Sequence, residues 1–419
     1  MRRWLHIEAE ELKEGVGPIS AEKVNTGDRD ESGKPPERDA SIAGHAETRY
    51  RKALLIGHYG GANTGDEAML VSLLHALPKS LAIDIVAKND AALPLDGRED
   101  IRAIGMGAIA VLKAAWSADI VILGGGTHFH DDYLGARLLR HYRYMARYVA
   151  VFCISKMLRK RVFFLGMGIG PLRRWPSRLI ARCAFALADG ISVRDQASLE
   201  EASALGAGKK TLRAFDLTAL KFADQITSAK PSNPLWLAVS LTDIPGSESK
   251  LVGRMRLVET LAGGLGQLLA TRHDVCVKVV VIRGGERESD IELSQLLVEA
   301  LSKYRDRVKL HPYSHDPEDC AREFRSSYAA CVMRYHAGLL AYLAGCRLLL
   351  LPYHRKLVDL GCELGLSPSA CPPLHSLTAS VLAKHLSELI SAESAEYAAT
   401  LPIRTARELA LRNILVMDL

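Results

Sequence analysis

The chain has 419 residues, of which 48% are hydrophobic and 24% are charged, and its formal net charge is +6. This length suffices for two ordinary domains, and the composition is that of a globular protein. The charge is uneven, because residues 1–50 contain 8 Lys and Arg against 11 Asp and Glu, which leaves +9 on the remainder. A modestly basic body favours an anionic substrate or surface, and we expect no nucleic-acid partner.

The start of the chain turns acidic at once, so we do not expect a secretory signal. No stretch has the length and apolarity of a membrane-spanning helix. The eight cysteines form no CxxC pair, which favours free thiols in a reducing compartment, and we expect a cytoplasmic protein. Residues 1–49 are rich in Glu, Asp, Lys, Gly and Pro and are predicted to form a disordered polar tail.

Residues 50–224 alternate between apolar strands and helices. The continuous apolar strands indicate a parallel sheet covered by helices on both faces, which defines a first domain. Strands are predicted at 53–57, 82–87, 119–123, 161–166 and 190–193, and helices at 67–77, 133–158, 174–188 and 196–205.

The pattern breaks at 222–234, where polar, Ser- and Pro-containing sequence predicts a linker. Alternation resumes across 235–395, which we predict to be a second domain. Residues 396–419 add a helix that we expect to pack back on the first domain. The predicted fold class is therefore α/β, with two Rossmann-like, doubly wound domains facing each other across a cleft.

A glycine-rich turn at 57–65 joins the first strand to the first helix. It contains neither GxxxxGK[ST] nor a clean GxGxxG, so no common nucleotide-binding motif is present. Gly60 and Gly61 either bring backbone N–H groups to an anionic ligand at the helix N-terminus, or belong to a tight connection in which Asn63, Thr64 or Asp66 caps the helix. Asp66 would be unusual beside an anion unless it handles a proton or a hydroxyl.

Ligands of such sheets bind beyond the carboxyl ends of the strands, so polar residues there are candidates. After the strand at 119–123, the sequence GGGTHFHDD supplies Gly125, Gly126, His130 and Asp131. Histidines and carboxylates in this pattern suit either a metal site or a polar loop that lines the cleft. We favour the loop and expect no metal.

Basic side chains follow three further strands. Arg194, in SVRD, either forms a local ion pair or aims its planar fork at a carboxylate or phosphate. Arg334 and His336, in MRYH, stand between a strand and a small helix, where the imidazole caps, packs or catalyses. Lys356 stands at the start of a helix, where the dipole disfavours a cation unless an anion lies between them.

Arg137, Arg140, Arg143 and Arg147 fall on one face of the helix at 133–158. This is either a solvated basic face or a surface that docks on a membrane or a lipid-linked phosphate. The second interpretation predicts peripheral association with the inner face of the cytoplasmic membrane.

Six stretches together resemble the polysaccharide pyruvyl transferase family, bacterial enzymes that move pyruvate from phosphoenolpyruvate onto sugar hydroxyls as a ketal. The chain departs from the family at Gly61-Ala62, at His130 and at His354-Arg355. The matching stretches are GHYGGANTGDEAML at 57–70, VILGGGTHFHD at 121–131, LGMGIGPL at 165–172, ISVRDQAS at 191–198, MRYHAGLLAYLAG at 333–345 and LPYHRKLVDLGCELGL at 351–366.

The resemblance implies a two-domain fold similar to that of GT-B glycosyltransferases. It also implies phosphoenolpyruvate as donor, a sugar or lipid-linked oligosaccharide as acceptor, and no further cofactor. Its functional residues carry over to this chain as Asp66, Arg194, His336 and Lys356.

The chemistry of these side chains agrees with that set. Arg194 suits the donor carboxylate and Lys356 its phosphate. His336 is the candidate acid for the enol carbon or a phosphate partner, and Asp66 the candidate base for the acceptor hydroxyl. Two alternatives remain open, a GT-B glycosyltransferase with a nucleotide-sugar donor, for which Glu363 could hold the ribose, and a non-catalytic phospholigand-binding protein of the same fold.

Overall fold

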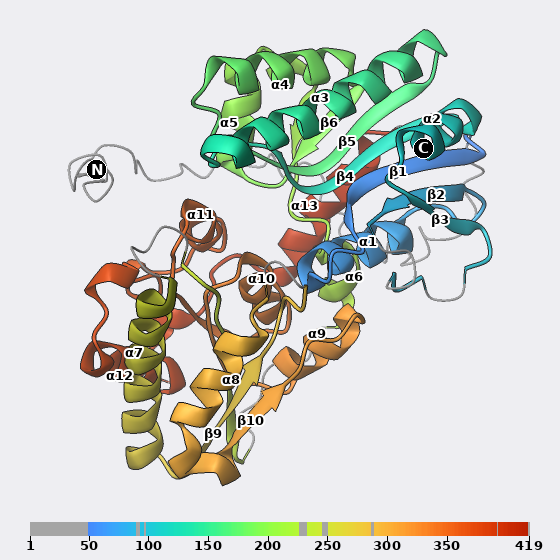
Figure 1. Cartoon of the computed structure of the whole chain (residues 1–419). Helices are drawn as coiled ribbons and strands as arrows, with labels where there is room; N and C mark the ends of the chain where they lie inside the picture. The colour runs from blue at the N-terminus through green and yellow to red at the C-terminus, as the bar shows by residue number, and fades with distance from the viewer. Residues whose placement is uncertain are drawn as a thin grey trace, which may run out of the picture. The chain divides into compact units, whose positions relative to one another are not determined.

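The computed structural model describes residues 49–88, 93–95, 98–225, 233–244, 250–285, 289–391 and 393–417. Two parallel β-sheets, each flanked by helices, make up this part of the chain (Figure 1). The predicted tail lies almost wholly outside the described residues, and so does more than half of the predicted linker. The predicted fold class, α/β with parallel sheets, is confirmed.

The first sheet has seven strands in the order β3-β2-β1-β4-β5-β6-β7. The order reverses between β1 and β4, and in sheets of this kind ligands bind at the carboxyl edge beside such a reversal. The strands are β1 (Lys52–Tyr59), β2 (Ala82–Ala87), β3 (Ile101–Gly105), β4 (Ile120–Phe129), β5 (Arg161–Ile169), β6 (Gly190–Val193) and β7 (Thr211–Arg213).

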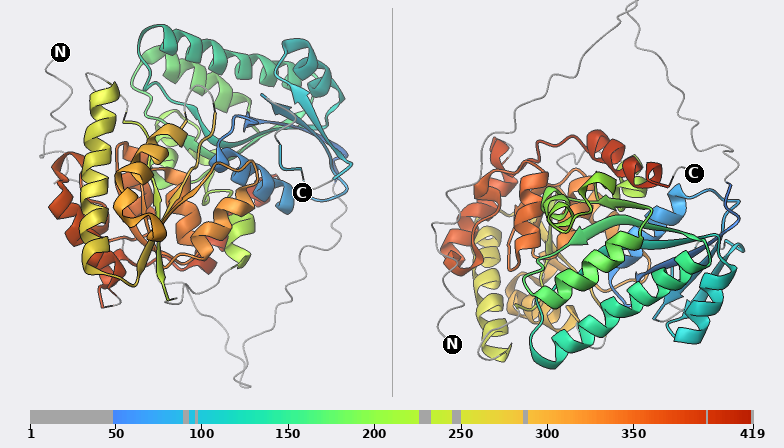
Figure 2. Two further views of the ribbon diagram at one scale, coloured as in Figure 1. Left: turned by 60° about the horizontal axis from the view of Figure 1, so that its bottom comes forward. Right: turned by 90° about the horizontal axis from the view of Figure 1, so that it is seen from above.

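Helices cover both faces of the first sheet (Figures 1 and 2). Alternate residues of each strand point to opposite sides, so Leu54 packs in one core and Leu55 in the other. The first face carries α2 (Ala108–Ser117), α3 (Gly135–Met157), α4 (Trp175–Leu187) and α5 (Gln196–Ala204), and the second carries α1 (Thr64–Ala76), α6 (Ala219–Phe222) and α13 (Ile403–Leu415).

The second sheet has five strands in the order β10-β9-β8-β11-β12, which repeats the reversal of the first. Its strands are β8 (Leu235–Ser240), β9 (Val275–Val280), β10 (Val308–His311), β11 (Ala329–Val332) and β12 (Arg347–Leu350). Its helices are α7 (Lys250–Thr271), α8 (Ile291–Ala300), α9 (Pro317–Arg325), α10 (Tyr335–Leu343), α11 (Arg355–Glu363) and α12 (Ala379–Ile390).

The two sheets share a hydrophobic core, because Leu70 and Leu220 belong to the same buried cluster as Phe324 and Leu339. Two main-chain hydrogen bonds also join them, from Thr64 N to Ile282 O at 3.0 Å and from Gly284 N to Ala62 O at 3.0 Å. The glycine-rich turn of the first half is therefore fixed to the second half.

The C-terminal helix α13 returns to the first sheet. Asn413 is fully buried there; its Nδ2 donates to Phe215 O at 2.8 Å, and its Oδ1 accepts from Ser192 Oγ at 2.7 Å. Among the described residues, none of the helices has both the length and the apolar character needed to cross a membrane.

Candidate active site

The N-terminus of α1 is capped by Asn63. The Asn63 Oδ1 accepts from Gly65 N at 3.4 Å, and its Nδ2 donates to Asp66 Oδ2 at 2.6 Å. The N–H of Asn63 donates to Glu67 Oε1 at 3.3 Å, and the N–H of Thr64 is held by the second half. The turn is thus a tight, capped connection, and Asn63 positions the Asp66 carboxylate.

Glycines in these turns leave room for functional side chains. A Cβ at Gly65 would lie 2.1 Å from His336 Nδ1, so the imidazole of the second half lies directly against the first turn of α1. Gly126 has a φ of +81°, and a Cβ there would lie 3.9 Å from Asp66 Oδ1. Gly60 and Gly125 also have positive φ, whereas a Cβ at Gly61 would come no closer than 3.5 Å to its nearest neighbour, His58 O.

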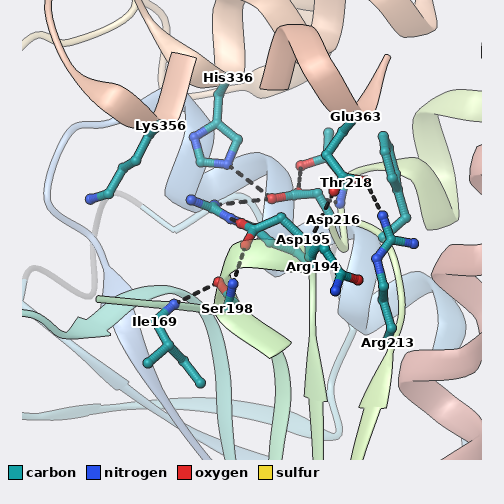
Figure 3. Close-up of polar contacts among 12 residues, drawn as sticks. Ile169, Arg194, Asp195, Ser198, Arg213, Asp216, Thr218, His336, Lys356 and Glu363 are labelled. Atoms are coloured by element: carbon teal, nitrogen blue, oxygen red, sulfur yellow. Dashed lines mark hydrogen bonds and ion pairs between the residues drawn. The ribbon is translucent and has the colours of Figure 1, made fainter. Parts of the chain in front are cut away.

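Asp216 connects Arg194 to His336 (Figure 3). Its Oδ2 lies 3.2 Å from Arg194 Nη1 and 3.7 Å from His336 Nε2, and its Oδ1 accepts from the N and Oγ1 of Thr218 at 3.0 and 2.8 Å. Burial alone would raise the pKa of Asp216, but His336 and Arg194 hold it well below its usual range. The sequence signal was weak, because Asp216 follows the three-residue strand β7.

Arg194 is a buried, fixed positive charge. Only 4% of it is exposed, its Nε lies 3.4 Å from Asp195 Oδ2, and its guanidinium lies 4.1 Å from the centre of the Tyr335 ring. Burial opposes the charge, but Tyr335 and the two carboxylates raise the pKa of Arg194 above its ordinary value. With Nε and Nη1 engaged, Nη2 is the donor that remains for a ligand.

Lys356, the second residue of α11, carries a half-buried ammonium group. Its ammonium makes no ion pair or hydrogen bond with any described residue, and no dashed line reaches it in Figure 3. Burial and the charge of Arg194 lower the pKa of Lys356 to about 8, although Asp132, Asp195 and Asp66 act in the opposite direction. Two neighbouring cations, one of them unpaired, favour an anionic ligand.

His336 lies at an open helix N-terminus. Arg334 is the N-cap of α10 and its side chain does not cap the helix, and the N–H groups of Tyr335, His336 and Ala337 have no hydrogen-bond partner among the described residues. The His336 Nε2 is buried, and its 3.7 Å separation from Asp216 is too long for a hydrogen bond. Because it combines free N–H groups with the positive end of the helix dipole, the N-terminus of α10 is a better anion site than the capped N-terminus of α1.

The Asp66 carboxyl group has a pKa above its ordinary value. Burial raises the pKa of Asp66, and the charge of His336 and the hydrogen bond from Asn63 oppose that rise. A carboxyl group with a raised pKa takes up and releases protons closer to neutrality than an exposed one does.

Comparison with known proteins identifies the family. The model of the family described as polysaccharide pyruvyl transferase matches residues 63–355. The chain belongs to this family. The resemblance inferred from its sequence motifs is therefore confirmed, and a search of curated proteins gives no match.

Solved structures similar to this pyruvyl transferase homologue share its fold. A putative UDP-N-acetylglucosamine 2-epimerase from Listeria monocytogenes has 13% identity and a TM-score of 0.58, over 87% of this chain and 95% of that one. A UDP-GlcNAc 2-epimerase from Methanocaldococcus jannaschii has 10% identity and a TM-score of 0.56, over 88% of this chain and 99% of that one. These enzymes support the GT-B-like architecture, and at such low identity they show the fold alone.

Three other predicted site residues of this pyruvyl transferase homologue have different surroundings. Asp131 accepts from Arg174 N at 2.6 Å and from Ser177 Oγ at 2.7 Å, so it is engaged at the start of α4. Arg334 directs its guanidinium to Asp290, with hydrogen bonds of 3.0 and 2.6 Å. Burial, Lys356 and His141 lower the pKa of His130 to about 3, which leaves its imidazole neutral. Among the described residues, no group of three or more His, Cys, Asp or Glu side chains is arranged so that it could hold a metal ion.

A stack of rings beside the site was not predicted from the sequence. The His58 and His128 rings stack at 4.2 Å, and Tyr144 lies 5.7 Å from His58. The Nε2 of His128 lies 2.6 Å from Gly125 O, and burial lowers the pKa of His128 to about 3. This neutral ring therefore fixes the glycine segment inside β4, where Gly126 lies close to Asp66.

Proposed function

We propose that the chain transfers pyruvate from phosphoenolpyruvate to two hydroxyls of a sugar, in a bacterial surface polysaccharide or its lipid-linked precursor. The products are a pyruvate ketal and phosphate. Beyond family membership, one observation carries the proposal: the unpaired ammonium of Lys356 lies in the electrostatic field of Arg194. The carboxylate and phosphate of phosphoenolpyruvate would complement these two cations.

The reaction balances without a further reactant. A proton joins the methylene carbon of phosphoenolpyruvate, which becomes a methyl group and leaves C2 with oxocarbenium character. One acceptor hydroxyl bonds to C2, the bond between C2 and the phosphate oxygen breaks, and the second hydroxyl closes the ketal. Of the two hydroxyl protons, one replaces the proton given to carbon and the other leaves on hydrogen phosphate.

In this proposal His336 donates the proton, and Asp216 positions its imidazole. The Asp216 carboxylate, which its lowered pKa keeps ionised, lies 3.7 Å from His336 Nε2. Asp66 accepts the hydroxyl proton, for which its raised pKa is suited. Lys356 and the open N-terminus of α10 hold the phosphate, and the Nη2 of Arg194 faces the carboxylate.

Phosphate release from phosphoenolpyruvate by the purified full chain, with bacterial glycans as acceptors, tests the proposal. We expect His336→Ala and Asp66→Ala each to lower the rate by about 10²- to 10⁴-fold, the usual contribution of a positioned acid or base. His75→Ala, on the exposed far end of α1, is the matched control and should keep the rate. Near-normal turnover in both site variants would remove these roles.

The same assay separates a nucleotide-sugar donor, because that reaction would release a nucleotide. The structure does not favour this alternative at Glu363, whose carboxylate accepts from Gln196 N at 3.0 Å and pairs with Arg213. Mass spectrometry of the surface polysaccharide from cells with and without the protein would then identify the ketal.

A further inference from the structure

One face of the first half is strongly basic. Residues 133–188, which include α3 and α4, contain twelve Lys and Arg and no Asp or Glu. The exposed side chains include four arginines on α3 that make no ion pair with any described residue, Arg137, Arg140, Arg143 and Arg147. Their spacing of three and four residues places them on one side of the helix.

Large apolar side chains are exposed at the starts of α3 and α4 and of the neighbouring helix α2. Ile109 in the first turn of α2 is 73% exposed, Leu134 at the N-cap of α3 is 63% exposed, and Trp175 at the start of α4 is 75% exposed. Leu139 and Leu179, one turn further along α3 and α4, are also exposed. We call these five residues the apolar rim.

The apolar rim lies at the edge of the sheet that carries the site. α2, α3 and α4 each follow a parallel strand, so their N-termini lie at the carboxyl edge, where Asp66 and Arg194 also follow strands. α3 packs against both α2 and α4, and the right-hand view in Figure 2 looks onto this layer. The loop that enters α3 contains Asp132, whose Oδ2 lies 3.4 Å from His354 Nε2 beside Lys356.

We propose that the apolar rim docks on an anionic phospholipid bilayer, with the arginines of α3 against the lipid headgroups. Exposed Trp, Ile and Leu lie on helices adjacent to the four arginines of α3, and residues 133–188 contain no Asp or Glu. This combination matches an interface of apolar chains and negative headgroups. This docking deepens the proposed function, because it would bring a lipid-linked acceptor to the edge of the sheet that carries the site. Only that link to the acceptor rests on the proposed function.

Vesicle co-sedimentation of the full chain tests this docking without any turnover. We expect binding to phosphatidylcholine vesicles that contain phosphatidylglycerol, much weaker binding to phosphatidylcholine alone, and loss of binding as salt is raised. Removing two arginines with Arg140→Gln/Arg143→Gln should weaken binding by about tenfold or more. Ile109→Ser/Trp175→Ser should also weaken it, while leaving its dependence on salt.

Two controls complete the experiment. Arg404→Gln/Arg412→Gln removes the same charge from exposed positions on α13, which covers the opposite face of the sheet, and should bind like the parent. Phosphate release with a water-soluble acceptor should be unchanged in the rim and arginine variants, so a failure of docking is distinguishable from a failure of the proposed activity. Equal binding by all variants, no binding to anionic vesicles, or a dimer that the rim variant dissociates in sedimentation would overturn the proposal.

Discussion

At the scale of single residues, the contact between Gly65 and His336 has the sharpest consequence. A methyl group at position 65 would overlap the imidazole ring, so Gly65→Ala must displace His336 from Asp216. We expect kcat/KM for phosphoenolpyruvate to fall by about 10²-fold, the typical cost of misplacing a catalytic group by about 1 Å. Steady-state phosphate release measures this change.

Gly61→Ala is the matched control for Gly65→Ala. A Cβ at Gly61 would meet only His58 O, at 3.5 Å, which is ordinary contact, so activity should be kept. Equal activity of the two variants would show that His336 does not depend on its contact with α1.

The lowered pKa of Lys356 predicts an alkaline limit to activity. The free enzyme loses the ammonium as pH rises through about 8, so kcat/KM should fall above that pH. In Lys356→Arg the charge is kept at all working pH values, and this alkaline limb should disappear even if the rate is lower. A limb that stays near pH 8 in the arginine variant would assign it to another group.

Sequence reasoning finds site residues at strand ends but cannot see what each one contacts. The structure packs His336 against the first turn of α1, which carries Asp66. The charges of Arg194 and Asp66 both act on Lys356. Asp131 and Arg334 satisfy the same strand-end rule and yet bind α4 and Asp290, a partner choice fixed by tertiary packing. His58 and Asp216 were missed because their roles come from ring stacking and from a three-residue strand.

At the scale of secondary-structure elements, the buried Glu67 carboxyl in the first turn of α1 lowers the stability of the folded state at neutral pH. Glu67 is fully buried and accepts the N–H of Asn63, and burial raises the pKa of Glu67 to about 8. Between about pH 4.5 and pH 8 the Glu67 carboxyl therefore stays protonated in the folded state but is ionised in the unfolded state. The contribution of Glu67 to the free energy of unfolding is fully present below pH 4.5 and is lost as the pH rises toward 8.

Glu67→Gln should remove this dependence. The amide oxygen can still accept the Asn63 N–H, and no ionisation is required for unfolding. We expect the free energy of unfolding at neutral pH to rise by roughly 1–3 kcal/mol, given about 1.4 kcal/mol for each unit of pKa shift. Urea titrations at pH 4 and pH 7 check it, and an equal effect at both pH values would contradict this account.

Most elements follow from local pattern, and the exceptions have physical reasons. β2 and β6 end where their apolar runs end, because strands buried on both faces need such runs. β3 and α2 were not predicted, since β3 has only one buried residue and Gly107, before α2, offers no side-chain cap. α1 begins at Thr64, three residues earlier than predicted, because Asn63 and not Asp66 is its cap.

At the scale of the whole molecule, α13 links the end of the chain to the centre of the first sheet. Asn413 is buried and makes hydrogen bonds to Ser192 and Phe215. Asn413→Ala would leave their polar groups unsatisfied, which costs about 1–3 kcal/mol in the free energy of unfolding. Chemical denaturation measures this loss; Arg404→Ala, exposed on the same helix, should change stability far less, and equal losses would show that Asn413 has no special role.

The alternation of strands and helices predicted both sheets but not how they are joined. The shared cluster around Phe324 and Leu339 combines residues that are far apart in the sequence, and no local pattern specifies such pairing. The same is true of Glu363, which pairs with Arg213 across a separation of 150 residues.

The hydrogen bonds of Thr64 with Ile282 and of Gly284 with Ala62 form a seam only a few residues from Asp66. Any swing of one sheet away from the other must either pivot about this seam or tear it. If the seam is the pivot, His336 and Asp66 keep nearly the same separation while the parts of the two sheets farthest from the seam move apart to admit a bulky glycan. The amide protons of Thr64 and Gly284 would then exchange slowly with solvent, because their hydrogen bonds persist throughout the motion.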